Sequence, residues 1–431
     1  MKPGIRMRIN LKWDDKSDQP DIIRDRALKR KIYKSIRWDS FKLLATNLLL
    51  YPASYLVYLI FPAQKKRVNT EGFFGISVNL DKNPKQTRAL VDDLAVNNLL
   101  IRMPLHDIEN LEKYVAFAEQ FKGKKLLINV LQDRRHVEDL ALLKTSLTQI
   151  FEQFSHLTTH FQMGNAINRK KWAIFSMDEY LRFYKVAYDL KNKQFPDLIL
   201  LGSSVIDFEY YFTIRTLFNF HKVRFDQCSS LLYVDRRGAP ENTQMGFDLV
   251  KKLRFLHTLL RLSPKTGTDI IISETNWPLV GTKPYSPTSE TECVTLEEQA
   301  NYLVRYYLLA LSTGVVKQVY WHQLIAPGYG LVDNRGDTLN QYPAYQAFKV
   351  MLGYLKGAEF LGIKDNVNDN KGCYQASFKS GSRKVDVVWA LTTATLKSEN
   401  KQIVSRDGVE LVSQPSLDIG PSPIYLIQDV D

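Results

Sequence analysis

Residues 98–130 read NLLIRMPLHDIENLEKYVAFAEQFKGKKLLINV and contain one strand–helix–strand unit. Asn98–Met103 and Lys125–Val130 are short apolar runs, which are typical of buried strands. Asn110–Gln120, between them, carries apolar residues at helical spacing. This order predicts two parallel strands joined by a helix.

The same alternation continues on both sides of this unit, from residue 72 to about residue 355. The other strand candidates are Phe73–Val78, His160–Met163, Leu198–Leu201, Gln227–Tyr233, Asp269–Ser273 and Gln318–Trp321. The other helical segments are Val137–Phe154, Met177–Lys191, Gly246–Leu262 and Leu296–Leu311. Eight strands, each followed by a helical stretch, predict an α/β fold of the (β/α)₈ TIM-barrel type. A doubly wound open sheet is the alternative, but Gly75-Ile76-Ser77-Val78-Asn79 lacks its GxGxxG pattern.

The sequence pattern changes after Tyr354. Short β-branched or aromatic runs follow at Gly372–Lys379, Lys384–Leu391, Lys401–Val404 and Pro423–Ile427. They predict a small antiparallel, sandwich-like β module. We therefore expect an N-terminal arm over 1–68, a barrel over 69–355 and a β module over 356–431.

The composition is that of an ordinary globular protein, with 45% apolar and 24% charged residues among 431. The three cysteines show no CxxC spacing, which disfavours a disulfide framework and a structural zinc site. No HExxH pattern occurs among the histidines. We expect neither a metal nor a cofactor.

The net charge of +12 is concentrated at the N-terminus. Residues 1–70 hold 16 Lys and Arg against 6 Asp and Glu, whereas the rest of the chain holds 42 against 40. A nearly neutral body disfavours a nucleic-acid groove across it.

Within the arm, a basic stretch precedes a charge-free run over residues 43–61, LLATNLLLYPASYLVYLIF, and Lys65, Lys66 and Arg67 follow it. Nineteen helical residues can just cross a hydrocarbon layer of ~30 Å. Three interpretations stay open: a signal anchor, a helical hairpin in one leaflet, and a helix packed on the barrel. We expect residues 24–67 to contact an anionic membrane surface. A spanning helix would place the body in the periplasm at the inner membrane, by the excess of basic residues before it. The alternative is a peripheral protein on the cytoplasmic side.

Functional residues of a (β/α)₈ barrel follow the carboxyl ends of its strands. Here those positions carry polar and aromatic side chains, a mixture that suits a carbohydrate. They include Arg102, His106, Asn165, Asn168, Arg169, Tyr233, Glu274, Asn276, Trp277, Trp321 and His322.

Two of these segments carry a specific resemblance. Ile271-Ile272-Ser273-Glu274-Thr275-Asn276-Trp277 resembles the seventh-strand nucleophile motif of clan A glycoside hydrolases, and Phe161-Gln162-Met163-Gly164-Asn165 resembles their fourth-strand motif. Arg102, Tyr233 and Trp321 also fall where that clan, including its β-xylosidase-related and cellulase-like families, places residues around the sugar. The resemblance covers roughly residues 72–350. It implies that Glu274 is the nucleophile of a retaining enzyme. From their places after the strands, we expect the other residues of the preceding list to bind substrate.

The chain departs from this pattern at one position. Where the resemblance places the acid/base glutamate, the sequence has Ala166. A retaining glycosidase needs two carboxyl groups ~5–5.5 Å apart, and alanine can neither donate nor accept a proton. Four explanations fit: a glutamate replaced to trap substrate, another acid, a substrate with a good leaving group, or a barrel that binds glycan without cleaving it. The candidates for another acid are Asp133, Asp207, Glu209, Asp235 and His322.

Two functions therefore compete. The first is a retaining-type glycoside hydrolase that acts on a surface polysaccharide or lipopolysaccharide glycan. The second is a non-catalytic glycan-binding barrel that assists polysaccharide assembly or export. Glu274 paired with Arg102 is also an arrangement that a purely structural carboxylate would show.

Overall fold

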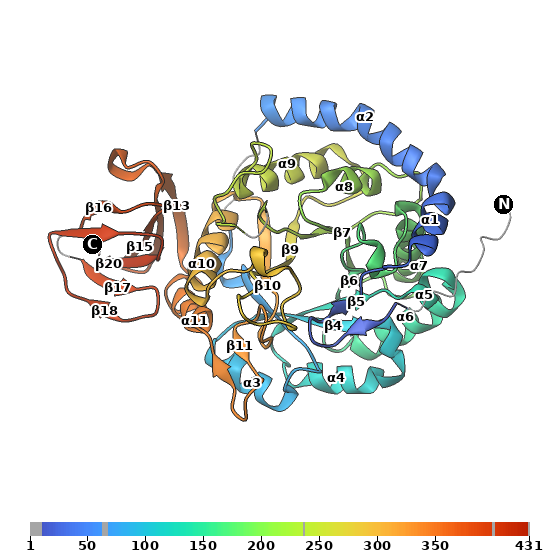
Figure 1. Cartoon of the computed structure of the whole chain (residues 1–431), viewed down its shortest axis with the longest axis horizontal. Helices are drawn as coiled ribbons and strands as arrows, with labels where there is room; N and C mark the ends of the chain where they lie inside the picture. The colour runs from blue at the N-terminus through green and yellow to red at the C-terminus, as the bar shows by residue number, and fades with distance from the viewer. Residues whose placement is uncertain (1–10, 63–67, 236–237, 399–400, 430–431) are drawn as a thin grey trace.

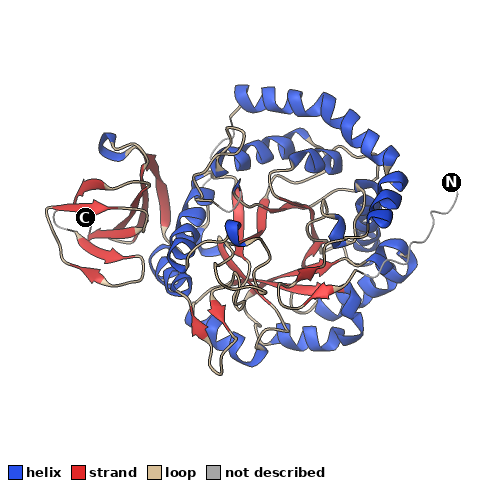
Figure 2. Cartoon of the chain, in the orientation of Figure 1, coloured by secondary structure: helices blue, strands red, loops and turns tan. Residues whose placement is uncertain are grey.

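The computed structural model describes residues 11–62, 68–235, 238–398 and 401–429. Its centre is a closed barrel of eight parallel strands in chain order, in which the last strand pairs with the first (Figures 1 and 2). The strands are β3 (Phe74–Val78), β4 (Asn98–Pro104), β5 (Lys125–Leu131), β6 (His160–Met163), β7 (Ile199–Ile206), β8 (Gln227–Leu231), β9 (Ile270–Thr275) and β10 (Val316–Trp321). The predicted TIM barrel is confirmed, and all eight strands lie at the predicted places.

The helices of the barrel form an outer ring around these strands (Figure 2). They are α3 (Pro84–Asp93), α4 (Leu111–Glu119), α5 (Arg134–Glu138), α6 (Leu140–Phe154), α7 (Met177–Gln194), α8 (Tyr210–Leu217), α9 (Leu249–Leu262), α10 (Leu296–Ser312) and α11 (Pro343–Leu355). The single helix expected over 137–154 is divided, because Asp139 leaves the helical conformation and caps α6 through Ala141 and Leu142.

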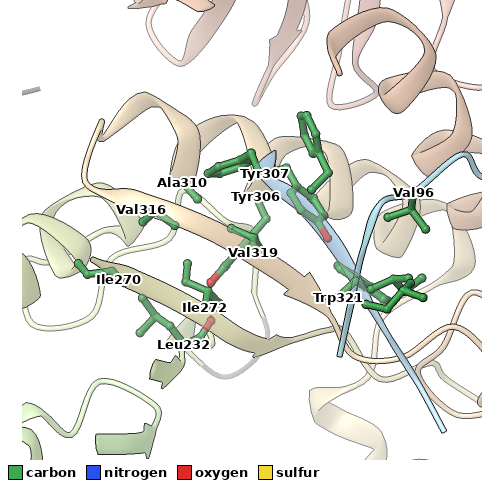
Figure 3. Close-up of a cluster of buried hydrophobic side chains, with 14 of the residues drawn as sticks. Val96, Leu232, Ile270, Ile272, Tyr306, Tyr307, Ala310, Val316, Val319 and Trp321 are labelled. Carbon is green, nitrogen blue, oxygen red and sulfur yellow. Dashed lines mark hydrogen bonds between the residues drawn. The ribbon is translucent and has the colours of Figure 1, made fainter. Parts of the chain in front are cut away.

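The core between the ring and the barrel is apolar and closely packed. Figure 3 shows α10 against β9 and β10, with Tyr306 and Tyr307 pointing toward the strands. The Tyr306 hydroxyl donates to the Leu232 carbonyl at 2.6 Å, and the Tyr307 hydroxyl donates to the Gly75 carbonyl at 2.7 Å. A Cβ atom at Gly75 would lie 2.6 Å from the Tyr320 ring, so this approach requires glycine.

The C-terminal module lies beside the barrel, at the left of Figure 1. Its six-stranded sheet has the order β13-β14-β15-β20-β17-β18, and β16 and β19 form a second, two-stranded sheet. The strands are β13 (Glu359–Asp365), β14 (Cys373–Ser380), β15 (Arg383–Ala390), β16 (Ala394–Lys397), β17 (Gln402–Ser405), β18 (Glu410–Leu411), β19 (Ser416–Ile419) and β20 (Ile424–Asp429). A hydrogen bond joins the two parts: the Trp389 indole of the module donates at 2.8 Å to Glu241 of the barrel, which also forms a buried ion pair with Arg305 of α10. A further two-stranded sheet, β11 (Val332–Asp333) with β12 (Asn340–Gln341), follows the barrel's last strand.

The described part of the N-terminal arm, residues 11–62, packs on the barrel. Its first described part is a hairpin of β1 (Trp13–Asp14) and β2 (Gln19–Pro20) that enters the barrel mouth. Residues 21–25 lead from it to α1 (Arg26–Ser35) and then α2 (Arg37–Ile60). The sequence WDDKSDQP gave no strand signal, because the hairpin is fixed by polar contacts to distant barrel residues.

Helix α2 lies along the outside of the barrel, over α8 and α9 (Figure 1). Tyr51, Tyr55 and Tyr58 pack against Phe255, and Lys42 pairs with Asp178 at 2.5 Å. Among the described residues, α2 is the one helix long and apolar enough to cross a membrane, judged by length and composition. Its opposite face is exposed, and includes Leu44, Leu48, Leu49, Leu56, Leu59 and Ile60. The basic residues 65–67 lie outside the described residues.

Candidate active site

Glu274 is the centre of a hydrogen-bond cluster at the carboxyl ends of the barrel strands. Its Oε2 accepts from Arg102 of β4 at 3.0 Å and from the Asn165 amide, after β6, at 3.4 Å. Its Oε1 accepts a 2.6 Å bond from the hydroxyl of Tyr233, which follows β8. Four strand ends therefore meet on one buried carboxylate, as the motifs predicted.

The cluster favours the ionised form of Glu274. Burial alone would raise the pKa of this carboxyl, but His322, Arg102 and the bonds from Tyr233 and Asn165 outweigh it and hold the pKa below its usual value. Burial, aided by Arg102, lowers the pKa of His322 to about 3, so this imidazole is neutral at neutral pH. We therefore attribute the ionisation of Glu274 at that pH mainly to Arg102 and the two hydrogen bonds.

Gln132, after β5, positions Asn165 and had no assigned role in the sequence. Its Oε1 accepts from the Asn165 backbone amide at 2.9 Å, and its Nε2 donates to the carbonyls of Asn165 and Trp172 at 2.8 and 2.6 Å. These bonds fix the loop after β6 next to Glu274. The position of Gln132 directly after a strand could have marked it as a candidate site residue. Its contact with Asn165, however, depends on the path of the loop after β6, which the sequence does not show.

Ala166, the next residue of this loop, is 1% exposed and has a left-handed backbone with φ of 45°. Its methyl group belongs to a small apolar cluster with Leu131, Trp172 and Tyr233. The position is thus beside the candidate nucleophile, but it carries no group that transfers protons.

The four carboxylates predicted as alternative acids do not replace a glutamate there, and His322, which does line the cavity with Glu274, has its pKa lowered to about 3 and carries no acidic proton at neutral pH. Asp207 and Glu209 both pair with Arg169, at 2.6 and 2.8 Å. Asp133 is bonded to the His136 ring at 2.8 Å. Among the described residues, neither these three carboxylates nor Asp235 lines a cavity next to Glu274.

The predicted binding residues divide into two groups. Asn276, His322 and Arg169 line a cavity of about 190 Å³ together with Arg102, Tyr233 and Glu274, and His106 lines a second cavity of about 180 Å³. Asn168 is instead bound to the Ile206 backbone and to Glu209, at 2.6 Å from the latter's carboxylate.

Trp277 and Trp321 are placed differently from the prediction. Both indoles are fully buried and stack on each other, with ring centroids 5.9 Å apart. They lie in the hydrophobic core, because the side chains packed over them close off their faces. Neither lines the cavities, so we correct the expectation that they contact substrate.

The hairpin contributes residues that sequence reasoning missed. Asp18 is 5% exposed, and Arg102 donates to its carboxylate at 3.1 Å. The hairpin's Trp13 packs edge-on against Trp172, with ring centroids 5.7 Å apart. Gln19 accepts a 2.5 Å bond from Lys171. Asp18 separates the two cavities and lines both.

Metal chemistry has no obvious location in the part of the chain that the structure describes. No group of three or more His, Cys, Asp or Glu side chains there is arranged to hold a metal ion. The arrangement around Glu274 is instead suited to holding one carboxylate ionised beside a polar cavity.

No protein-family model matches the sequence, and a comparison with curated proteins finds no match. Solved structures do match. A family 39 glycoside hydrolase from Bacteroides cellulosilyticus WH2 has a TM-score of 0.62 and 17% identity, over 85% of this chain and 82% of that one. A family 39 β-xylosidase from Caulobacter crescentus has a TM-score of 0.58 and 12% identity, over 85% and 98%. A family 30 endoxylanase from Clostridium papyrosolvens C71 has a TM-score of 0.57 and 11% identity, also over 85% and 98%. The chain therefore has the fold of clan A glycoside hydrolases.

Proposed function

We propose that this protein is a retaining-type glycoside hydrolase that acts on a surface polysaccharide or lipopolysaccharide glycan, with Glu274 as its nucleophile. The observation that carries the proposal is the triple contact of Arg102, Tyr233 and Asn165 with one ionised carboxylate beside a polar cavity. The fold, shared with glycoside hydrolases, supports it.

In the proposed reaction, a Glu274 oxygen attacks the anomeric carbon as the bond to the leaving oxygen breaks. The electron pair of that bond stays on the leaving oxygen, and a glycosyl ester forms on Glu274. Water then hydrolyses the ester, so the sugar gains a hydroxyl and Glu274 returns to its carboxylate.

Ala166 makes the two proton transfers of this reaction slow. The leaving oxygen must depart without a positioned donor, and water must attack without a positioned base. A positioned general acid or base contributes a factor of ~10²–10⁴ to the rate. Aryl glycosides with acidic leaving groups escape the first limit, because their departure needs no proton.

The test uses 2,4-dinitrophenyl β-glycosides of several sugars with the full-length protein. We expect a burst of one dinitrophenolate per protein followed by slow turnover, and we expect azide to speed the slow phase because it attacks without deprotonation. Glu274→Gln should abolish the burst, whereas the exposed Glu152→Gln should retain it. A burst that survives Glu274→Gln would contradict the assignment of the nucleophile.

The second candidate is a glycan-binding barrel without catalysis, and the burial of Ala166 among apolar side chains favours it. Such a protein would bind oligosaccharide and show no burst in any variant. Binding without a burst would therefore select this candidate.

We further propose that α2 attaches the protein to the inner membrane by lying in its surface. One face of α2 is held on the barrel by tyrosine packing and the Lys42–Asp178 pair, and the other face is apolar and exposed. This packing disfavours the signal anchor, on which the expectation of a periplasmic body depends. The basic α1 beside it favours the anionic, cytoplasmic leaflet.

A further inference from the structure

The tip of the β1–β2 hairpin places one carboxylate deep in the barrel mouth. Asp18 has a left-handed backbone, with φ of 54°, and its side chain is buried. Three donors from different strand ends converge on its Oδ2: Arg102 Nη1 at 3.1 Å, Asn79 Nδ2 at 3.1 Å and Gln323 Nε2 at 3.2 Å. The barrel therefore holds a ready set of donors for a carboxylate, and its own chain fills them.

These donors belong to the cleft that contains Glu274. The guanidinium of Arg102 binds Asp18 through Nη1 and Glu274 through Nη2. The side chain of Arg102 therefore bridges Asp18 and the candidate nucleophile. A ligand group that took its place would sit next to the reacting centre.

The hairpin also divides the mouth into spaces that are too small for a glycan. The cavities on its two sides measure about 190 and 180 Å³, and ligand clefts usually begin near ~300 Å³. Because Asp18 and Arg102 line both, withdrawal of the hairpin would join them into one cleft.

Withdrawal would leave that cleft with cations that have fewer partners. Arg102 would lose its Nη1 contact with Asp18, and Lys171 would lose Gln19, the side chain it binds at 2.5 Å. Lys171 and Arg102 both line the larger cavity. An anionic ligand is therefore favoured there over a neutral one.

Docking of the hairpin buries the carboxylate of Asp18, and this desolvation costs free energy. Burial raises the pKa of Asp18, and Arg102 only partly offsets that rise. Desolvation of this carboxylate thus outweighs the attraction that its partners return. Trp13 and Gln19 supply further contacts, and both are only partly buried.

We propose that Asn79, Arg102 and Gln323 form a carboxylate-binding subsite for an acidic sugar, in which Asp18 takes the place of the sugar's carboxylate. This inference rests on the proposed glycan function of the mouth, and it specifies the substrate class as a glycan that contains uronic acid units. The hairpin then competes with substrate for the same donors.

The test compares methyl β-D-glucuronide with methyl β-D-glucoside, and the corresponding galacto pair, as ligands of the full-length protein by titration NMR. Each pair differs only in a carboxylate against a hydroxymethyl group. We expect Asp18→Ala to tighten uronide binding at least tenfold and to leave neutral glycoside binding nearly unchanged. The matched control is Asp21→Ala, an exposed aspartate directly after the hairpin that lines neither cavity, which should change neither.

Hydrogen exchange of residues 11–22 reports hairpin release independently of any sugar. If Asp18→Ala alone leaves these amides protected, the Trp13→Ala/Asp18→Ala double variant, which also removes the packing on Trp172, is used for the titration. Faster exchange without tighter uronide binding would overturn the subsite.

The remaining outcomes separate this inference from the proposed function. Equal gains for uronides and neutral glycosides would overturn the subsite while the glycan site stands. Absence of binding to every sugar, together with no burst on aryl glycosides, would overturn both. Loss of the burst in Asp18→Ala would show that Asp18 supports the reaction of Glu274 and does not compete with substrate, and would overturn its role as a stand-in.

Discussion

The Tyr233 hydroxyl donates a 2.6 Å hydrogen bond to Oε1 of Glu274, while Arg102 and Asn165 donate to the other carboxylate oxygen. Tyr233 therefore donates to a carboxylate oxygen that neither Arg102 nor Asn165 contacts by a hydrogen bond. The ionisation of Glu274 therefore depends in part on this phenol.

Tyr233→Phe should raise the pKa of Glu274, because the ionised form loses a donor. A hydrogen bond to a charged group contributes ~1.5–3 kcal/mol, which would move the acid limb of the pH–rate profile up by roughly one to two pH units. The measurement is burst rate against pH with a dinitrophenyl glycoside. Tyr306→Phe removes a buried hydroxyl that binds the Leu232 carbonyl, and should leave the limb in place.

Ala166→Glu should increase turnover of natural glycans, up to the ~10²–10⁴ that a positioned acid contributes. The glutamate must displace part of the cluster with Trp172, so some loss of stability is also expected. Ala166→Gln is the matched control, since it has similar volume and donates no acidic proton. Equal rates for the two variants would count against an acid/base role for this position.

The stability of the protein should depend on pH through His322. Its pKa is about 3 when folded and ~6.5 in the unfolded chain, so the unfolded state binds a proton first as pH falls. The free energy of unfolding should therefore decline between pH 6.5 and pH 3, by roughly 2–3 kcal/mol at pH 4.5 from this group. Urea unfolding of His322→Gln should show a smaller decline than the native protein, and the exposed His156→Gln should follow the native curve. Parallel curves for native protein and His322→Gln would refute this assignment.

The exposed face of α2 should bind anionic vesicles. Leu48→Asp/Leu56→Asp replaces two side chains that are 77% and 57% exposed, and should weaken binding by about 100-fold or more, at ~1.5–3 kcal/mol for each buried leucine. The measurement is co-sedimentation with phosphatidylglycerol vesicles. The control Val409→Asp/Val412→Asp alters exposed apolar residues of the β module and should bind as the native protein does. If both double variants lost vesicle binding to a similar extent, the added negative charge would be the cause, and the apolar face of α2 would not be the binding surface.

The barrel was predictable because its strands are continuous apolar runs, and such runs are buried whatever their neighbours are. The contact of Glu274 with Arg102 and Tyr233 was predictable for a related reason, since strand ends of a closed barrel meet at one face. The division of the helix at Asp139 was not predictable, because it depends on one side chain that caps α6.

The positions of the hairpin and of the two buried tryptophans could not be predicted from the sequence. Asp18 and Arg102 are 84 positions apart and meet through polar contacts, which leave no periodic pattern in the chain. Trp277 and Trp321 follow strands, as substrate-binding residues do, but their burial depends on how β9 and β10 pack against α10. Such placements depend on tertiary packing and not on local preference.

The five residues between β2 and α1 set how far the hairpin can move. Fully extended, residues 21–25 span at most roughly 17 Å, and α1 leads directly into α2, which is held on the barrel by the Lys42–Asp178 pair. A competitor tied this closely has an effective concentration in the millimolar range. A free monosaccharide at micromolar concentration would rarely displace it. A polymer with many acidic units presents its carboxylates at a high local concentration, so such a short tether would make occupancy of the cleft depend on the local density of such units.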